Sequence, residues 1–260
     1  MSAIKSLVLR TAGTNCDYET AYALETAGAV AERVHVNRLA EGSVRLDDYR
    51  ILAIPGGFSY GDDVAAGKIL AVEIIARLGE AVRKFVERGG LVIGICNGFQ
   101  VLVKTGLLPG PSCEPGAATL TDNDCRRFYD NWVSLKLLPS KSLWTVGTGQ
   151  IIRLPVAHGE GKFAVRDKET LDRITTGGQV ALQYCDAAGK AAEDFPMNPN
   201  GAVLSIAGVS DETGQVLGLM PHPERFIFGR QGPDWTRQEA APEWGDGLRL
   251  FKNAVVAAKS

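Results

Sequence analysis

Cys96 lies in the segment whose residue types best fit covalent catalysis. An apolar run, Leu91–Ile95, leads into the pattern Gly-x-Cys-x-Gly formed by Gly94, Cys96 and Gly98. This is the sharp strand-to-helix turn called a nucleophile elbow, in which small neighbours leave room for the strained backbone. A thiol at the start of a helix is favoured as the thiolate, which is the nucleophilic form. The pattern therefore predicts a cysteine nucleophile; the alternative is a buried cysteine that only packs between strand and helix.

A thiolate nucleophile needs a proton shuttle, and histidine is the usual one. His222 follows the apolar run Val216–Leu219 and stands in the sequence Pro-His-Pro-Glu. The flanking prolines restrict the backbone, and Glu224 can hold the imidazole in one tautomer. We therefore predict a triad of Cys96, His222 and Glu224, against the alternative that Pro-His-Pro-Glu is a structural turn.

The chain has two further histidines and four further cysteines for which we predict no catalytic role. His35 ends a predicted strand and is expected to be a surface or core residue. His158, in a glycine-rich loop, is expected to contact the substrate or an interface. Cys16 could line the same cleft as Cys96. No C-x-x-C pair is present, so the sequence predicts no metal site and no redox dithiol. The cysteines other than Cys96 are Cys16, Cys113, Cys125 and Cys185.

Attack on an amide carbonyl creates an oxyanion, which backbone N–H groups must stabilise. In an elbow one donor is the residue after the nucleophile, here Asn97, and the other lies in a loop after a neighbouring strand. Gly56 and Gly57 follow the apolar run Ile51–Ile54 and fit that second role. A phosphate-binding loop is the competing interpretation, but neither G-x-x-x-x-G-K-[ST] nor G-x-G-x-x-G opening a helix is present.

The predicted elements place these residues at the carboxyl ends of strands. Alternating apolar runs and helical periods indicate an α/β fold, a flavodoxin-like doubly wound and mostly parallel sheet. We expect one domain over residues 1–260, whose second half extends the same sheet. The predicted strands are Ile4–Leu9, Ala29–Val34, Ile51–Ile54, Leu91–Ile95, Trp132–Leu138, Ile151–Val156, Val180–Tyr184, Val203–Ile206 and Val216–Leu219. The predicted helices are Tyr18–Ala27, Ile69–Arg88, Lys168–Ile174 and one beginning after Cys96, with loops at 145–149 and 198–201.

Composition excludes several classes of function. The formal net charge is −2 and the sequence pI is about 6.0, so nothing favours nucleic acid or an anionic membrane as partner. The N-terminal apolar stretch is too short for a signal peptide or a membrane span. We therefore expect a cytoplasmic protein whose cysteines are free thiols.

Together these motifs resemble class I (triad) glutamine amidotransferases. Within that class they most resemble the family of glutaminase subunits of phosphoribosylformylglycinamidine synthase, which belongs to purine biosynthesis. The matching segments run in order along nearly the whole chain: 13–17, 55–62, 96–100, 123–124, Arg127, Phe128, Trp132, 157–161, 198–201 and 220–225. The chain departs from the family pattern at Asn131, where a basic residue is expected, and in a longer segment at 226–243.

The resemblance implies a residue-by-residue assignment. Cys96, His222 and Glu224 would be the triad, Gly57 and Asn97 would supply oxyanion N–H groups, and Phe58 and Gln100 would line the glutamine pocket. The chain itself would need no cofactor. ATP and Mg²⁺ would bind to a large partner synthetase, often accompanied by a small third subunit, which converts formylglycinamide ribonucleotide to formylglycinamidine ribonucleotide with ammonia from this chain.

Two other functions remain open from the residues. One is a cysteine hydrolase or chaperone-like protein of the same elbow architecture; there a histidine commonly follows the cysteine, whereas here Asn97 does. The other is a non-enzymatic binding subunit, which would be expected to lose the thiol or the imidazole, and both are present.

Overall fold

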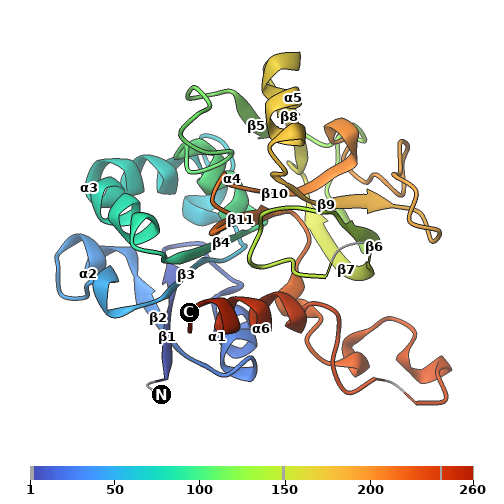
Figure 1. The fold of residues 1–260 in the computed structure, drawn as a ribbon, viewed down its shortest axis with the longest axis horizontal. Helices are drawn as coiled ribbons and strands as arrows, with labels where there is room; N and C mark the ends of the chain where they lie inside the picture. The colour runs from blue at the N-terminus through green and yellow to red at the C-terminus, as the bar shows by residue number, and fades with distance from the viewer. Residues whose placement is uncertain (1–2, 148–149, 241, 260) are drawn as a thin grey trace.

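A computed structural model describes residues 3–147, 150–240 and 242–259. Its centre is a nine-stranded sheet in the order β2-β1-β3-β4-β11-β10-β9-β6-β7 (Figure 1). The first five strands in this order are parallel, and each later neighbour pairs antiparallel. The strands are β1 (Ile4–Arg10), β2 (Ala29–His35), β3 (Ile51–Ile54), β4 (Leu91–Ile95), β6 (Tyr129–Leu137), β7 (Ile151–His158), β9 (Val180–Cys185), β10 (Ile206–Ser210) and β11 (Val216–Leu219).

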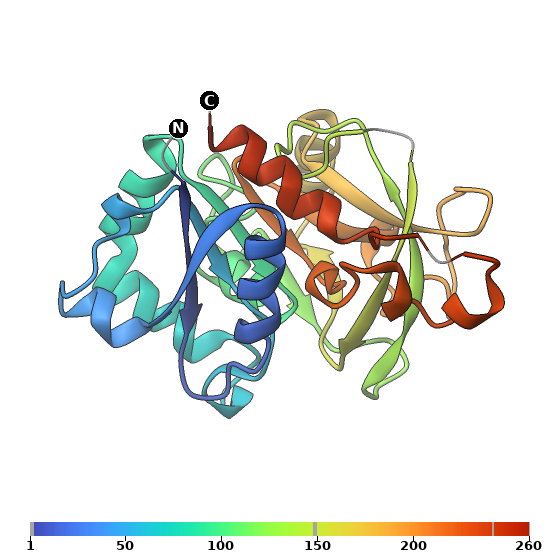
Figure 2. The same ribbon diagram turned by 90° about the horizontal axis from the view of Figure 1, so that it is seen from below.

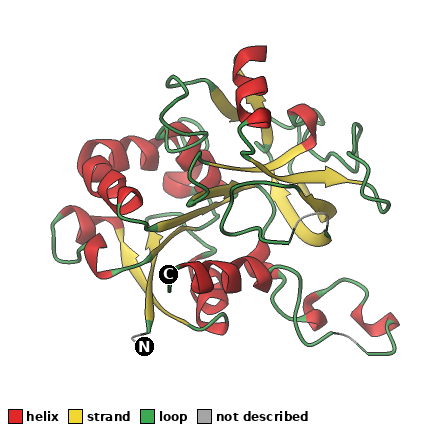
Figure 3. Cartoon of the chain, in the orientation of Figure 1, coloured by secondary structure: helices red, strands yellow, loops and turns green. Residues whose placement is uncertain are grey.

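Helices cover both faces of the parallel half, while β5 and β8 form a separate two-stranded sheet (Figure 3). Helices α1 and α6 pack together on one face, and α2, α3 and α4 lie on the other (Figures 1 and 2). The bounds are α1 (Asp17–Thr26), α2 (Val36–Ala40), α3 (Lys68–Glu87), α4 (Asn97–Lys104), α5 (Lys168–Thr176), α6 (Leu248–Ala257), β5 (Ala118–Thr121) and β8 (Lys162–Val165).

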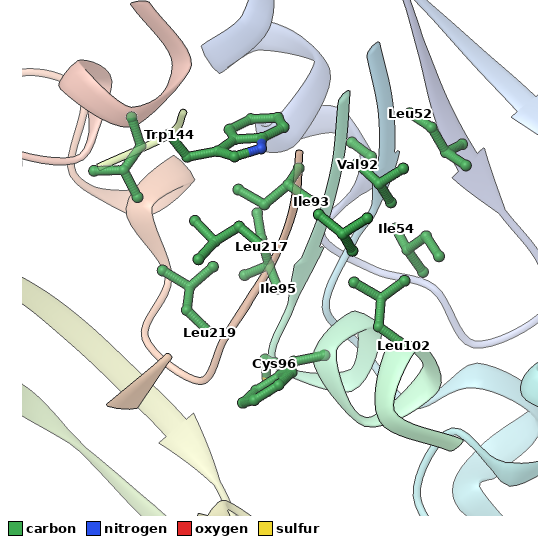
Figure 4. Packing of buried hydrophobic residues seen from close by; sticks show 14 of the residues in the cluster. Leu52, Ile54, Val92, Ile93, Ile95, Cys96, Leu102, Trp144, Leu217 and Leu219 are labelled. Atoms are coloured by element: carbon green, nitrogen blue, oxygen red, sulfur yellow. The ribbon is translucent and has the colours of Figure 1, made fainter. Parts of the chain in front are cut away.

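The core lies where β4 and β11 pair in the middle of the sheet. Every residue of both strands is buried, as expected for parallel strands covered on both faces. Trp144 packs at the end of this strand pair opposite Cys96 (Figure 4) and donates a hydrogen bond through its indole N–H to the Gln215 carbonyl, 2.9 Å away. One end of the strand pair is therefore packed against Trp144, and the other end carries Cys96.

The α/β fold predicted from the sequence is confirmed, and the second half of the chain does extend the same sheet. The sheet is mixed, because β10, β9, β6 and β7 run antiparallel. The predicted strand at Val203–Ile206 is wrong: residues Val203–Ser205 form a 3₁₀ turn with Leu204 at φ 47°, and β10 begins only at Ile206. Residues 148–149 of the predicted loop 145–149 lie outside the described residues.

The segment after His222 is built from 3₁₀ turns held by aromatic contacts. These turns are η4 (Pro223–Arg225), η5 (Gly229–Gln231) and η6 (Trp235–Arg237). Phe226 meets Trp132 of β6 edge to face at a centroid distance of 5.0 Å, which fastens the segment to the antiparallel half. Asn131, the departure from the family pattern, is exposed on β6 and donates a hydrogen bond to the Tyr129 hydroxyl.

No helix among the described residues is both long and apolar enough to cross a membrane.

Candidate active site

The junction between β4 and α4 presents Cys96 in a strained backbone conformation. Its φ is 51° and its ψ −106°, a region that side chains other than glycine rarely adopt. A Cβ on Gly98 would lie 1.9 Å from the Ile54 carbonyl oxygen, and one on Gly94 would lie 2.5 Å from that of Gly98. Both glycines are therefore required by contact, and the predicted elbow is present.

His222 reaches the same place from the neighbouring strand. Because β11 pairs with β4 in register, with Leu219 opposite Ile95, the carboxyl ends of the two strands coincide. The Cys96 N–H donates a hydrogen bond to the Leu219 carbonyl at 2.8 Å. Three residues later His222 is buried, and its Nδ1 lies 2.7 Å from Oε1 of Glu224.

The environment of His222 favours the imidazolium. Burial by itself would lower the pKa of this ring, but the charge of Glu224, followed by the two nearby thiols of Cys96 and Cys16, raises the pKa well above its usual value. The His222 Nε2 atom is buried and has no hydrogen-bond partner among the described residues. The ring is therefore oriented through Nδ1, and Nε2 remains available for chemistry.

Gly56 lets three reactive side chains meet. A Cβ at this position would lie 2.9 Å from Cε1 of His222, 3.2 Å from Sγ of Cys16 and 3.5 Å from Cβ of Cys96. Any larger residue at position 56 would push the His222 imidazole away from the thiols of Cys16 and Cys96. The predicted glycine loop after β3 is thus in contact with the triad residues.

Cys16 takes a larger part in this site than the sequence suggested. Its Sγ accepts a hydrogen bond from Nη2 of Arg225 at 3.1 Å and lies 3.2 Å from Oδ1 of Asn15. Burial, the largest influence, raises the pKa of the Cys16 thiol, against the opposing effect of His222. Arg225 is also paired with Glu19 of α1 at 2.8 Å. The contacts of Arg225 with Cys16 and with Glu19 were not predicted. Cys16 and Arg225 nevertheless lie in segments that match the family pattern.

These side chains surround a cavity of about 270 Å³. Cys96 and His222 of the predicted triad line it. Gly57, predicted as an oxyanion donor, lines it too, as do Phe58 and Gln100, which were predicted to line the glutamine pocket. Glu224 lies behind His222 and is not part of the wall. Further lining residues are Cys16, Asp62, His158, Glu160 and Arg225.

The two predicted oxyanion donors have free amides. No described residue accepts a hydrogen bond from the backbone N–H of Gly57 or Asn97. Gly57 has a φ of 136°, and a Cβ there would lie 2.7 Å from the Gly13 carbonyl oxygen. Its conformation therefore needs glycine, and it leaves the N–H unused.

Gln100 is more constrained than a substrate contact would require. Its Oε1 accepts from Nδ2 of Asn97 at 3.0 Å, and its Nε2 donates to the Glu160 carbonyl at 2.5 Å. Asn97 also donates to Oδ1 of Asp62 at 3.0 Å and accepts from the Ser59 N–H at 3.2 Å. This network joins the glycine loop, α4 and the loop after β7.

Phe58 is about half exposed at the mouth of the cavity.

His158 lies in the cavity wall, which agrees with the predicted substrate-side position. The ring is buried, and burial first and the nearby His222 second lower its pKa to about 4. His35, by contrast, lies away from the cavity and caps α2, accepting a hydrogen bond from the Asn37 N–H at 3.2 Å.

One set of described residues could approach a metal ion. Ligand atoms of Cys16, His222 and Glu224 lie within 4.8 Å of one another. The 2.7 Å contact between His222 and Glu224 already occupies one imidazole nitrogen and one carboxylate oxygen. The same atoms would suit an oriented acid–base pair, and the sequence predicted no metal here.

Comparisons with known proteins agree with this geometry. Residues 3–256 match the family of the CobB/CobQ-like glutamine amidotransferase domain. The phosphoribosylformylglycinamidine synthase subunit PurQ of Dehalococcoides mccartyi is 48% identical over 260 residues, covering 100% of this chain and 99% of the relative. PurQ of Pyrococcus furiosus is 38% identical, covering 99% of this chain and 100% of the relative.

The solved structures lead to the same family. One chain of the structure of PurLQS from Thermotoga maritima superposes with a TM-score of 0.75 at 31% identity, covering 100% of both chains. An amidotransferase family, a close sequence relationship along the full length and a shared fold all coincide with the cysteine elbow and the histidine–glutamate pair. The chain therefore belongs to the CobB/CobQ-like glutamine amidotransferases and, within them, to the family of phosphoribosylformylglycinamidine synthase PurQ subunits.

Proposed function

We propose that this chain is the glutaminase subunit of a phosphoribosylformylglycinamidine synthase, with Cys96 as nucleophile, His222 as acid–base and Glu224 as its orienting carboxylate. The observation that carries the proposal is the pairing of β4 with β11, which brings the thiol and the glutamate-bound imidazole to one cavity. The family match favours this function over a cysteine hydrolase or a binding subunit of the same fold.

In the first half-reaction the Cys96 thiolate attacks the side-chain amide carbon of glutamine. The resulting oxyanion accepts hydrogen bonds from the N–H groups of Gly57 and Asn97; losing one such donor typically costs about 2.7–4 kcal/mol. The carbon–nitrogen bond then breaks, and the imidazolium of His222 gives its proton to the departing nitrogen. Ammonia and a γ-glutamyl thioester on Cys96 are the products.

In the second half-reaction His222, now neutral, takes a proton from water as the water oxygen attacks the thioester carbon. The carbon–sulfur bond breaks, glutamate leaves, and the thiolate and imidazolium are restored. Phe58 at the cavity mouth contacts the substrate, while Gln100 holds the surrounding loops. No cofactor enters these steps.

The released ammonia goes to partner subunits. The related PurQ chains are named as subunits of phosphoribosylformylglycinamidine synthase, and the Thermotoga maritima structure is of PurLQS. We propose that a large synthetase binding ATP and Mg²⁺, with a small third subunit, uses the ammonia to convert formylglycinamide ribonucleotide to formylglycinamidine ribonucleotide. We further propose that residues 1–260 act as one domain in the cytoplasm, consistent with the nine-stranded sheet that both halves of the chain share and with five free cysteines.

The test is ammonia release from glutamine by wild type and Cys96→Ala, alone and with the synthetase, its ribonucleotide and ATP. Wild-type turnover should rise with the partner, and Cys96→Ala should lose at least about 10³-fold, because the covalent route is gone. Cys113→Ala, which removes a free thiol outside the cavity, should retain wild-type turnover. Full turnover by Cys96→Ala would show that the nucleophile is another group.

A further inference from the structure

His158 is a buried imidazole in the cavity wall that the mechanism above does not use. It ends β7, directly after Ala157, whose carbonyl oxygen lies 3.7 Å from Sγ of Cys96. The His158 side chain lines the same cavity as Cys96 and His222, and it is near enough to His222 for the charge of that ring to lower its pKa. It is 3% exposed, and its Nε2 is buried without a hydrogen-bond partner among the described residues.

The tautomer of His158 follows from its neighbour Asn123. The amide nitrogen of Asn123 donates to two carbonyl oxygens, those of Arg127 at 3.1 Å and His158 at 2.8 Å. Its Oδ1 must then be the acceptor, and it receives the Gly161 N–H at 3.0 Å. Oδ1 also lies 3.1 Å from Nδ1 of His158, so Nδ1 carries the proton.

With the proton on Nδ1, Nε2 presents only a lone pair. Gly161 fixes the ring against the loop, because a Cβ there would lie 2.4 Å from both Nδ1 and Cε1 of His158. Neutrality is maintained by burial and by the charge of His222, which hold the pKa at about 4. A buried acceptor of this kind requires an N–H or O–H donor from whatever occupies the cavity.

We propose that Nε2 of His158 accepts a hydrogen bond from the N–H of the amide nitrogen that leaves glutamine, and so positions the leaving group and the ammonia formed from it. This inference rests on the proposed glutaminase reaction. His158 takes no proton in any step; His222 supplies the proton to the nitrogen, and the carbon–nitrogen bond breaks as already described. A neutral acceptor also suits ammonia, since Nε2 carries no proton that could convert the product to ammonium.

The experiment compares two substrates that differ in the leaving group. The leaving nitrogen of glutamine carries N–H bonds throughout the reaction, whereas the methoxy oxygen of L-glutamate γ-methyl ester carries no hydrogen until His222 protonates it and methanol departs. Glutamate release from each is measured with the full chain and its synthetase partner, and the ratio of amide to ester kcat/KM is taken within each preparation. A partly misfolded fraction lowers both rates and leaves this ratio unchanged.

His158→Asn can keep a donor toward Asn123 but has no acceptor at the position of Nε2. We expect its amide-to-ester ratio to fall about tenfold, the effect of one lost hydrogen bond in the transition state. His158→Gln, whose longer amide can place an oxygen there, should recover most of the ratio. If His158→Asn fails to fold, His158→Leu provides the same acceptor-free measurement. His35→Asn, the same substitution outside the cavity, should match wild type.

An unchanged ratio in the acceptor-free variant would overturn the inference, because a residue that only supports the wall affects both substrates alike. Failure of the proposed function would look different: wild type would turn over neither substrate, or Cys96→Ala would retain activity.

Discussion

At the scale of single residues, the hydrogen bond between His222 and Glu224 decides how the site handles protons. Nδ1 faces the carboxylate at 2.7 Å, so the proton that moves during the reaction must be on Nε2. The carboxylate also keeps the ring protonated to a higher pH than an isolated imidazole. In the proposed reaction this direction favours the protonated ring as the acid that meets the leaving nitrogen.

Glu224→Gln tests this charge. The amide can still hydrogen-bond to Nδ1 but no longer stabilises the imidazolium, so the pKa of His222 should fall. We expect turnover to drop roughly 10- to 100-fold. The inflection that His222 contributes to the pH profile of kcat/KM should move to lower pH.

The measurement is the pH–rate profile for glutamine hydrolysis beside that of Glu169→Gln. Glu169 is an exposed carboxylate of α5, and its replacement should leave the profile unchanged. An inflection in Glu224→Gln at the wild-type pH would mean that the carboxylate does not set the protonation of His222.

Sequence patterns could predict the three residues of the proposed triad because proline and glycine spacing is a local signal. Cys96, His222 and Glu224 stand next to the breaks that position them. The part of Cys16 was missed, because its contacts with Arg225 and the His222 ring join segments far apart in the chain. The amide of Gln100 likewise gave no sign that it would bind the Glu160 carbonyl.

At the scale of elements, the turn between β4 and α4 has no space for added atoms. Gly98→Ala would place a Cβ 1.9 Å from the Ile54 carbonyl oxygen of β3. Because that oxygen belongs to the backbone of a central strand, it cannot move cheaply. We expect a loss of about 3 kcal/mol in the free energy of unfolding, together with loss of glutaminase activity.

Gly79→Ala is the matched substitution in a helix. Its Cβ would meet only the Ile74 carbonyl oxygen at 3.8 Å, in ordinary contact. Alanine should therefore stabilise α3 by about 0.5–1 kcal/mol. Urea unfolding of both variants makes the comparison; a Gly98→Ala protein as stable as wild type would refute the packing argument.

The elements with strong periodicity were predictable and those decided by context were not. The fully apolar β4 and the amphipathic α3 agree with their predicted ranges to within a residue. Val203–Ile206 has the composition of a strand, but Leu204 adopts a left-handed conformation, so the strand begins later. β5 and β8 were missed, since they pair with each other across a long stretch of chain.

At the scale of the whole molecule, the first and last α-helices of the described chain pack together behind the turn that carries Glu224. Helix α6 packs against α1, and both contact the turn η4 that carries Glu224 (Figure 2). A Cβ on Gly247, just before α6, would lie 1.9 Å from the Pro223 carbonyl oxygen. Arg225 of the same turn pairs with Glu19 of α1. The position of His222 and Glu224 thus depends on how α6 packs against η4 and α1.

Phe251→Ala should loosen that helix. The ring is fully buried, and truncating a buried phenylalanine costs about 3–5 kcal/mol in the free energy of unfolding. Val256→Ala, on the exposed side of α6, should change it by less than about 0.5 kcal/mol. Chemical denaturation followed by tryptophan fluorescence measures both, and equal stabilities would show that α6 is not part of the cooperative unit.

The place of β11 in the sheet has a consequence for how the protein comes into being on the ribosome. This strand is the last of the nine to be synthesised, yet it lies in the middle, between β4 and β10. A nascent chain that already contains the Cys96 thiol therefore has no neighbour for β4 on that side and no imidazole beside the sulfur. Pairing over such a sequence distance is slow, because the long loop must close first. Unfinished chains therefore lack glutaminase activity, and ammonia is released only by molecules in which β11 has paired with β4.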